Sequence, residues 1–553
     1  MKRRSVLAVL AAAQFLMVLD QAVMNVSISQ LVADFDTTVT AIQAVIALYA
    51  LVMAGLMMTG GKIGDLIGRR RAFAIGLCIY AVGSGLTAAS WSVPSLAIGW
   101  SLLEGIGAAL VLPAMVALVA GNFRGQERAV AYGVLGGVAG AGIAVGPILG
   151  GWATTDLSWR VVFAGEVVVA IGILIGIRLV DEPPRPARVP RLDWVGSVLS
   201  AAGLGTLVLG VLEASNWGWL RPRSSPIEPF GFSLTPFVIA VGALLLVGFA
   251  SWERRREERG EDPLFHLRLL RLPQLRGGVS MLLAQNLVLM GVFFTVPLFL
   301  QIVLGLDALE TGVRMLPASA GLFASALIGS ALARRFPART LVRAGVAVVF
   351  VATLLLLDTV DPELEDAAFL VAMGVLGVGM GLIVSQLGNV VQSAVGDEDR
   401  SEAGGLQNTA QQLGSSLGTA LLGAIVISGL LLAFTNEVAS NPQISANVRG
   451  QVEEHVAAGA GFVEAAQVEA SAKRAGLPPA TVTAIVGDYE DAQIAALKTA
   501  FLCAALLTLA SFFATRRLPT ERFDQMRAAP EGEDGDGGRG DAGQAVAPAA
   551  ATS

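Results

Sequence analysis

Long apolar stretches separated by short polar connections make up most of the chain. A helix needs about 20 apolar residues to cross the roughly 30 Å hydrocarbon core of a bilayer. Fourteen stretches meet this requirement, and they predict membrane-spanning helices at about 6–28, 41–60, 72–90, 94–120, 129–152, 159–178, 194–215, 236–252, 277–304, 312–333, 341–358, 367–390, 403–434 and 493–515. We therefore expect an all-α protein that crosses a membrane many times.

Arginine and lysine are concentrated in every second connection between these helices. Lys62 and the arginines of 69–71 lie in one such connection, four arginines lie in 178–191, and the stretch 252–276 is strongly cationic. The alternate connections are mostly acidic or neutral, as in 358–366. Because positively charged connections stay on the cytoplasmic side, we expect a multi-pass protein of the cell membrane with both termini in the cytoplasm.

Three polar segments lie outside the predicted spans. The cationic stretch 252–276 can lie along anionic headgroups, or it can act only as a linker that sets the topology. Residues 435–492 are polar and Ala-rich, and they predict an extracellular segment of two short helices with a break at 476–479. Residues 518–553 have the low-complexity composition of a disordered segment.

The composition excludes a soluble enzyme or binding module. Hydrophobic residues make up 54% of the 553 residues, charged residues make up only 15%, and the mean hydropathy is +0.66. An ordinary soluble protein carries about 25% charged residues. Two cysteines and two histidines are too few for a Cys/His metal cluster or a disulfide framework, and no GxxxxGK[ST] motif supports ATP-driven pumping. We expect no metal, cofactor or nucleic-acid partner.

One glycine-rich string, GIAVGPILGG at 142–151, lies in the fifth predicted span. Gly142, Gly146 and Gly150 recur every four residues and form a smooth stripe that lets helices approach closely. Pro147 removes a backbone hydrogen bond and weakens the helix at that point. A lone GxxxG would have little meaning, but the full GxxxGPxxGG string is specific.

A second string, GKIGDLIGRRR at 61–71, connects spans two and three. Its three glycines permit a tight turn, and Asp65 lies four residues before Arg69, so the two can pair on one face of a helix. Taken alone, this string would be no more than a charged connection that sets the topology.

These strings resemble the antiporter motif and the conserved loop motif of the major facilitator superfamily. Further strings, at 19–26, 159–163, 300–317 and 405–414, are similar to motifs of its fourteen-span drug:proton antiporter branch. The resemblance covers about 5–434 and 493–516 and implies a major facilitator fold, in which two six-helix bundles rock around a substrate near the membrane midplane.

The resemblance also implies a division of the chain. An N-terminal six-helix bundle (1–180) would be followed by two inserted transmembrane helices with the basic cytoplasmic linker (181–276). A C-terminal six-helix bundle (277–516) would contain the extracellular loop 435–492, and a disordered cytoplasmic tail (517–553) would end the chain.

The resemblance assigns roles to both glycine-rich strings. A gate that holds the cytoplasmic side closed would comprise Gly61, Gly64, Asp65, Gly68, Arg69 and Arg70. The hinge of span five would comprise Gly142, Gly146, Pro147, Gly150 and Gly151. The chain departs from the family in span four, where Ser101 occupies the place of a proton-relay arginine and Glu104 replaces a glutamine.

Three carboxylates lie inside predicted spans. At a rise of 1.5 Å per residue, Asp20 lies about 21 Å from the inner end of span one, Glu104 about 15 Å into span four, and Glu166 about 10 Å from the outer end of span six. Because an ionised carboxylate in hydrocarbon costs about 2.5–3.5 kcal/mol, all three are candidates for proton coupling or cation recognition. The alternatives are a helix-packing hydrogen bond for Asp20 and a salt bridge to Arg160 for Glu166.

Uncharged amides mark the second half of the chain. Those that could contact substrate are Gln285, Asn286, Gln386, Asn389, Asn408 and Gln411. Amides in these spans can bind substrate or bridge helices, and the sequence leaves both roles open.

Together these features predict a proton-coupled secondary transporter, expected to act as a monomer, that exports amphipathic or cationic drugs by alternating access. Its partners would be small-molecule substrates, protons and the lipid bilayer. The alternatives are an exporter of one endogenous lipid or secondary metabolite, and a membrane sensor that does not transport.

Overall fold

The computed structural model describes residues 2–123, 125–182, 191–223, 225–396, 399–457 and 462–520. Within these ranges the secondary structure is helical, without strands. Thirteen helices are long and apolar enough to cross a membrane, and a bent pair at 134–143 and 145–157 brings the number to fourteen. This agrees with the fourteen spans predicted from the sequence. Residues 521–553 of the predicted disordered tail lie outside the described residues.

Six spans form the N-terminal bundle, and the fourth is continuous through a π-helical segment, η1. Its helices are α1 (Lys2–Val26), α3 (Val39–Ile67), α4 (Arg69–Ala88), α5 (Val93–Leu96) with η1 (Ala97–Glu104) and α6 (Gly105–Asn122), α7 (Gly125–Trp152) and α8 (Trp159–Gly176). A short helix, α2 (Ile28–Asp34), follows α1.

Six further spans form the C-terminal bundle, and two more lie between the bundles in sequence. The C-terminal helices are α11 (Pro273–Pro297), α12 (Ala308–Leu332), α13 (Ala338–Thr359), α14 (Asp366–Ser393), α15 (Arg400–Ser440) and α18 (Pro479–Ser511). The inserted helices are α9 (Trp194–Trp217) and α10 (Thr235–Glu258).

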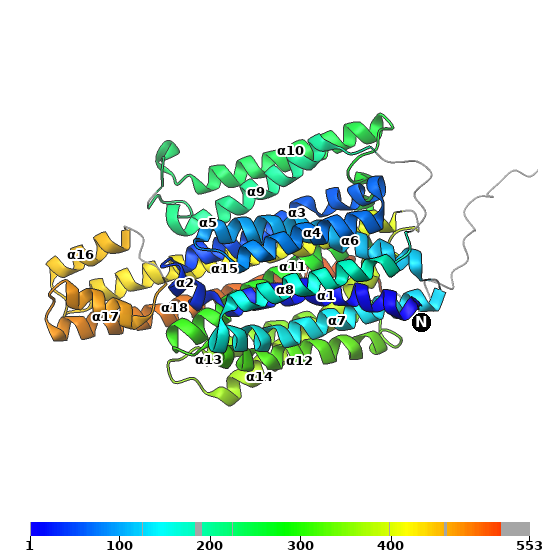
Figure 1. Cartoon of the computed structure of the whole chain (residues 1–553). Coiled ribbons are helices and arrows are strands. Elements are labelled where there is room, and N and C mark those ends of the chain that lie inside the picture. The colour runs from blue at the N-terminus through cyan, green and yellow to red at the C-terminus, as the bar shows by residue number, and fades with distance from the viewer. Residues whose placement is uncertain are drawn as a thin grey trace, which may run out of the picture.

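Two helix pairs make the most extensive contacts between the bundles, α3 with α15 and α7 with α12. Helix α9 packs on both α3 and α15 and so covers the first of these seams, and α10 packs on α9 at the edge of the molecule (Figure 1). The inserted pair therefore forms a hairpin, α9–α10, on the outside of the two-bundle body.

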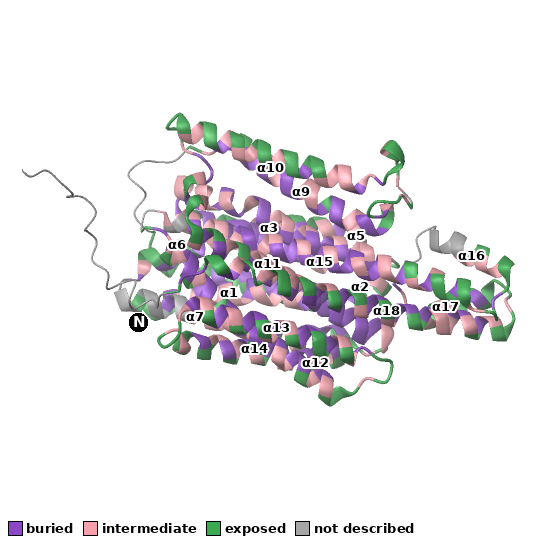
Figure 2. Ribbon diagram, turned by 180° about the vertical axis from the view of Figure 1, so that it is seen from behind, coloured by how far each residue is buried: buried purple, intermediate pink, exposed green. Residues whose placement is uncertain are grey.

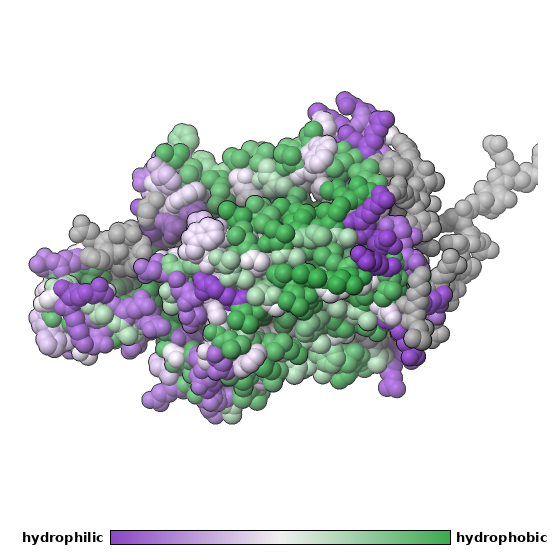
Figure 3. Space-filling view, in the orientation of Figure 1, coloured by the Kyte–Doolittle hydropathy of each residue, from purple (hydrophilic) through white to green (hydrophobic). Residues whose placement is uncertain are grey.

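The exterior matches a bilayer environment. On the face shown in Figure 3, apolar side chains cover the middle of the molecule and hydrophilic side chains gather toward its two ends. Exposed positions on the spans include large apolar residues such as Val82, Val168 and Leu244, whereas buried residues line the contacts between helices (Figure 2).

Helices α15 and α18 continue beyond the membrane-spanning body at the end opposite the N-terminus, where they pack with α16 (Ala446–Ala457) and α17 (Ala465–Arg474) (Figure 1). Gly476, with φ of 71°, lies in the turn between α17 and α18. The predicted break at 476–479 is confirmed to within one residue, because α17 ends at Arg474 and α18 begins at Pro479. The two short helices do not lie on either side of it as predicted: both α16 and α17 precede the break, and the chain after it is the start of the long helix α18. Phe434 and Tyr489 meet edge to face with ring centroids 5.2 Å apart, so this outer lobe has a core of its own.

Candidate functional site

The structure brings the three intramembrane carboxylates together. Asp20 of α1, Glu104 at the end of η1 and Glu166 of α8 each place one carboxylate oxygen within 4.8 Å of the others. Asp20 and Glu104 are 0% exposed and Glu166 is 2% exposed. The sequence placed these residues in three separate spans, and the fold makes them one cluster in the interior of the N-terminal bundle.

Asp20 is held by an aromatic pair. The Trp100 indole nitrogen donates to its Oδ1 at 2.7 Å, and the Trp100 ring stacks on Tyr49 at a centroid distance of 4.4 Å and an angle of 7°. The helix-packing hydrogen bond considered for Asp20 is therefore present. Among the described residues, the second carboxylate oxygen, Oδ2, is buried without a hydrogen-bond partner. This oxygen is therefore available to bind a proton or a cation.

The two glutamates are held by hydroxyl groups from α4. Thr87 donates to Glu104 at 2.9 Å, and Tyr80 and Ser84 donate to one oxygen of Glu166 at 2.8 and 3.1 Å. Like Asp20, each glutamate keeps one buried oxygen without a partner. No cation pairs with the cluster among the ion pairs of the described residues.

Local backbone geometry positions part of the cluster. The segment Ala97–Glu104 is π-helical, a wider turn that often occurs at functional sites, and it carries both Trp100 and Glu104. Ser101, at the family's arginine position, donates to the Val45 carbonyl of α3 at 2.7 Å. Because like charges at this distance in a buried site cannot all be ionised, the cluster requires protons or another cation.

Arg160 does not neutralise Glu166. Its guanidinium pairs with Asp34 at 2.9 Å and lies over the Trp159 ring at 4.3 Å, so the alternative of a Glu166–Arg160 salt bridge is wrong. Burial alone would raise the pKa of Asp34, but hydrogen bonds from Trp159, Gln30 and Arg160 outweigh it and lower that pKa. A carboxylate outside the spans is thus fully paired, whereas those inside are not.

The string 61–71 contains the turn between α3 and α4: residues 61–67 are the last turns of α3, Gly68 makes the turn, and 69–71 begin α4. Asp65 pairs with Arg69, as the spacing predicted, and Arg69 also donates to the Gly61 carbonyl at 3.0 Å. A Cβ on Gly64 would lie 3.0 Å from the Arg69 guanidinium. Glycine at position 64 therefore leaves room for the Arg69 side chain in this ion pair.

The same turn is tied to the end of the N-terminal bundle. Gly68 has φ of 104°, a conformation that favours glycine, and a Cβ there would lie 3.1 Å from the Glu182 carboxylate. That carboxylate accepts from the Arg70 backbone nitrogen at 3.2 Å, while the Arg70 side chain donates to the Val180 carbonyl at 3.2 Å. The turn thus connects α3 and α4 to the segment after α8.

The string 142–151 packs against two helices at once. Gly142, Gly146 and Gly150 face α1, and a Cβ on Gly150 would lie 2.9 Å from the Val23 Cα. Gly151 faces α12 of the other bundle, where an added Cβ would lie 2.4 Å from the Ala308 carbonyl oxygen. Pro147 lies on the same side, because its carbonyl oxygen would be 2.1 Å from a Cβ on Gly312 of α12.

The amides of the C-terminal bundle do not form one group. Gln386 bridges helices by donating to the Gly329 carbonyl of α12 at 2.9 Å, and Asn286 donates to Leu282 of its own helix at 3.0 Å. Gln285 lines a small cavity within the bundle, between α11, α13, α14 and α18. Asn389 is exposed, and Asn408 and Gln411 are half-buried.

The side chains that donate hydrogen bonds to the three buried carboxylates were not identified from the sequence. Tyr80, Ser84 and Thr87 are spaced four and three residues apart, so they share one face of span three. Trp100 lies four residues before Glu104. A polar stripe on an otherwise apolar span is the signal that could have identified them.

Comparisons with known proteins agree with this architecture. A family model described as Major Facilitator Superfamily matches residues 10–419. The puromycin resistance protein pur8 of Streptomyces alboniger is 33% identical over 452 residues, which cover 81% of this chain and 86% of the relative. The multidrug efflux pump LfrA of Mycolicibacterium smegmatis is 29% identical over 507 residues, which cover 91% and 94%.

A solved structure shares the fold. It is a bacterial homolog of the human lysosomal transporter Spinster in an inward-facing and unoccupied conformation, with a TM-score of 0.58 and 16% identity, and the match covers 94% of this chain and 98% of that chain.

Proposed function

Because the chain belongs to the major facilitator superfamily, we propose that it exports amphipathic or cationic drugs across the cell membrane in exchange for protons. It is a multi-pass membrane protein and a transporter rather than an enzyme. The relatives named for puromycin resistance and multidrug efflux support drugs as its substrates. With its positive connections inside, both termini lie in the cytoplasm, and the chain works as a monomer.

The observation that carries the proposal is the cluster of Asp20, Glu104 and Glu166. Its three buried carboxylates lack a paired cation within the described residues and keep one free oxygen each. Such a cluster binds protons when it faces outside and gives them up when it faces inside or when a cationic substrate approaches, since a positive substrate satisfies the same charge. Proton and substrate therefore compete for one site, which is the condition for exchange.

The glycine-rich strings supply the movement. The turn at 61–71 closes the cytoplasmic end of the N-terminal bundle, and the string 142–151 forms the close contact on which α7 turns against α1 and α12. In the amide set of the C-terminal bundle, Asn408 and Gln411 remain proposed substrate contacts, whereas Gln386 supports helix packing.

The test is transport by the purified chain in liposomes loaded with a pH-sensitive dye. With an imposed proton gradient, a lipophilic cation such as ethidium should move against its own gradient while protons move the other way. A variant with Asp20→Asn, Glu104→Gln and Glu166→Gln should move neither. The control Glu213→Gln should behave as the unmodified chain, because Glu213 lies near the end of α9, away from the cluster, and accepts from Asn216 at 3.0 Å. Substrate movement without proton movement would overturn the coupling.

A second candidate is export of one natural product, because the relative pur8 is named for resistance to a single antibiotic. Expression in a strain without its own efflux systems, tested against a panel of cationic dyes and antibiotics, separates the two. Protection against one compound class alone would favour the second candidate.

A further inference from the structure

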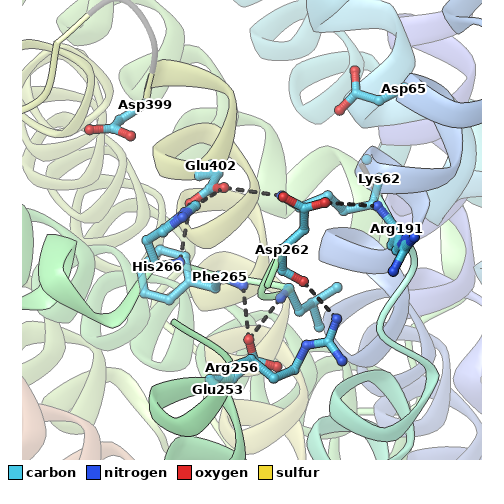
Figure 4. Close-up of polar contacts among 12 residues, drawn as sticks. Lys62, Asp65, Arg191, Glu253, Arg256, Asp262, Phe265, His266, Asp399 and Glu402 are labelled. Carbon is cyan, nitrogen blue, oxygen red and sulfur yellow. Dashed lines mark hydrogen bonds and ion pairs between the residues drawn. The ribbon is translucent and has the colours of Figure 1, made fainter. Parts of the chain in front are cut away.

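The basic linker between α10 and α11 meets both bundles at one point on the predicted cytoplasmic face. Glu402, in the first turn of α15, accepts from Lys62 of α3 at 3.1 Å. The same carboxylate contacts His266 of the linker, with Nδ1 at 2.9 Å and the backbone nitrogen at 3.2 Å (Figure 4). One carboxylate therefore joins the N-terminal bundle, the C-terminal bundle and the linker.

The linker is anchored immediately before His266. Glu253, buried near the end of α10, accepts from the backbone nitrogens of Leu264 at 2.7 Å and Phe265 at 3.4 Å (Figure 4). Leu264 and Phe265 are themselves buried, and Arg256 of α10 lies 3.4 Å from Asp193, which precedes α9. The position of His266 is thus set by the α9–α10 hairpin.

The charges around His266 favour its protonated form. The hydrogen bond with Glu402 and the charge of that carboxylate raise the pKa of His266, against the opposing effects of burial, Lys62 and Arg268. Further charged groups near this point are Asp65 of α3, whose carboxylate the Glu402 charge repels, and Asp399 before α15, which pairs with Arg268 at 3.0 Å. Asp262 of the linker also lies here, and its carboxylate accepts from the Arg191 backbone nitrogen at 3.2 Å (Figure 4).

We propose that His266 is a positioning residue of the cytoplasmic gate, because it holds the Glu402 carboxylate where Lys62 can pair with it. The gate then has three components: α3, α15 and the linker. Inward opening requires the cytoplasmic ends of α3 and α15 to separate, and the Lys62–Glu402 pair spans that seam. The hairpin is then part of the transport cycle rather than a passive insertion. Its role in the cycle rests on the export function proposed above, but the gate contact itself does not depend on proton coupling.

The proposal gives the gate a defined pH dependence. The charged contact between His266 and Glu402 is fully present below the ordinary histidine pKa of about 6.5 and is lost as pH rises through the raised pKa of His266. A neutral imidazole holds the carboxylate less strongly, because a charge-assisted hydrogen bond is about twice as strong as a neutral one. Alkaline conditions on the cytoplasmic side should therefore favour gate opening.

The test measures conformation without transport. Spin labels on Arg71→Cys and Ser393→Cys, both exposed positions on the predicted cytoplasmic face, report the separation of the bundles in nanodiscs by pulsed electron paramagnetic resonance. The background carries Cys78→Ser and Cys503→Ala. Between pH 5.5 and 8.5 the ratio of open to closed distances should rise about 1.5-fold to 5-fold, the range that partly exposed ion pairs sustain.

Two variants make the result decisive. His266→Gln should make the pH step smaller and shift the population toward its alkaline value, whereas Arg268→Gln, which removes the other linker ion pair, with Asp399, should keep the step. A pH step of unmodified size in His266→Gln would overturn the proposal. That result would leave proton coupling intact, because the liposome assay measures coupling separately.

Discussion

The two bundles treat polar groups in their interiors differently. The N-terminal bundle buries three carboxylates that keep unpaired oxygens, while the C-terminal bundle uses uncharged amides, of which Gln386 bridges to the Gly329 carbonyl. An amide can satisfy its partner and remain neutral in every state of a transport cycle. A carboxylate changes charge when it gains or loses a proton. This difference supports the proposal that coupling belongs to the N-terminal bundle, whereas the amide of Gln386 packs helices in the C-terminal one.

Removing a single carboxylate should produce the largest effect. Glu104→Gln keeps the shape of the side chain and the Thr87 hydrogen bond but cannot release a proton, so proton-driven export in liposomes should fall to the level of empty vesicles. Exchange of substrate for substrate, which needs no net proton movement, should persist. Normal proton-driven export by this variant would contradict the assignment of coupling to the N-terminal bundle.

The close contact between α7 and α12 can be disrupted by replacing one glycine, Gly151. Gly151→Ala would place a methyl group 2.4 Å from the Ala308 carbonyl oxygen, and overpacking of this kind costs about 1–3 kcal/mol. Thermal unfolding in detergent should shift to lower temperature and export should slow. The control is Gly136→Ala on the same helix, where an added Cβ meets nothing within 4 Å, and equal effects of both variants would refute the close contact.

A smaller effect is expected from the bridging amide. Gln386→Leu removes the hydrogen bond to the Gly329 carbonyl and should lower the free energy of unfolding by about 1 kcal/mol. The number of protons exchanged per substrate should not change. A changed proton ratio, measured with the pH-sensitive dye, would show that coupling extends into the C-terminal bundle.

The smallest effect concerns a carboxylate that is already paired. The pKa of Asp34 is lowered in the folded chain, so its pairing contributes stability above the ordinary aspartate pKa of about 3.9 that disappears as pH falls through the native value. Arg160→Gln should therefore cost about 0.2–1 kcal/mol near pH 7, with a smaller cost near pH 3. A loss of export by this variant would show that Arg160 has a role in transport besides its ion pair with Asp34.

The spans could be predicted from the sequence, because an apolar stretch of bilayer length has few other stable structures. The three acids could be identified for the same reason, since a charge inside such a stretch is costly. Their convergence could not be predicted, because it depends on how α1, α4 and α8 pack and on the π-helical segment that carries Trp100 and Glu104. The Lys62–Glu402 contact joins residues 340 positions apart, so it could be identified only from the three-dimensional structure.

Helix α15 is one continuous helix that extends from one end of the molecule to the lobe at the other end (Figure 1). It runs without interruption from Arg400 to Ser440, a length of about 60 Å, or roughly twice the hydrocarbon thickness of a bilayer. Because the helix is continuous, we expect a tilt at its Arg400 end to displace the lobe at its Ser440 end. With both termini in the cytoplasm, as proposed above, this lobe lies outside the cell, and an antibody fragment or fluorophore attached to it would report the state of the opposite face.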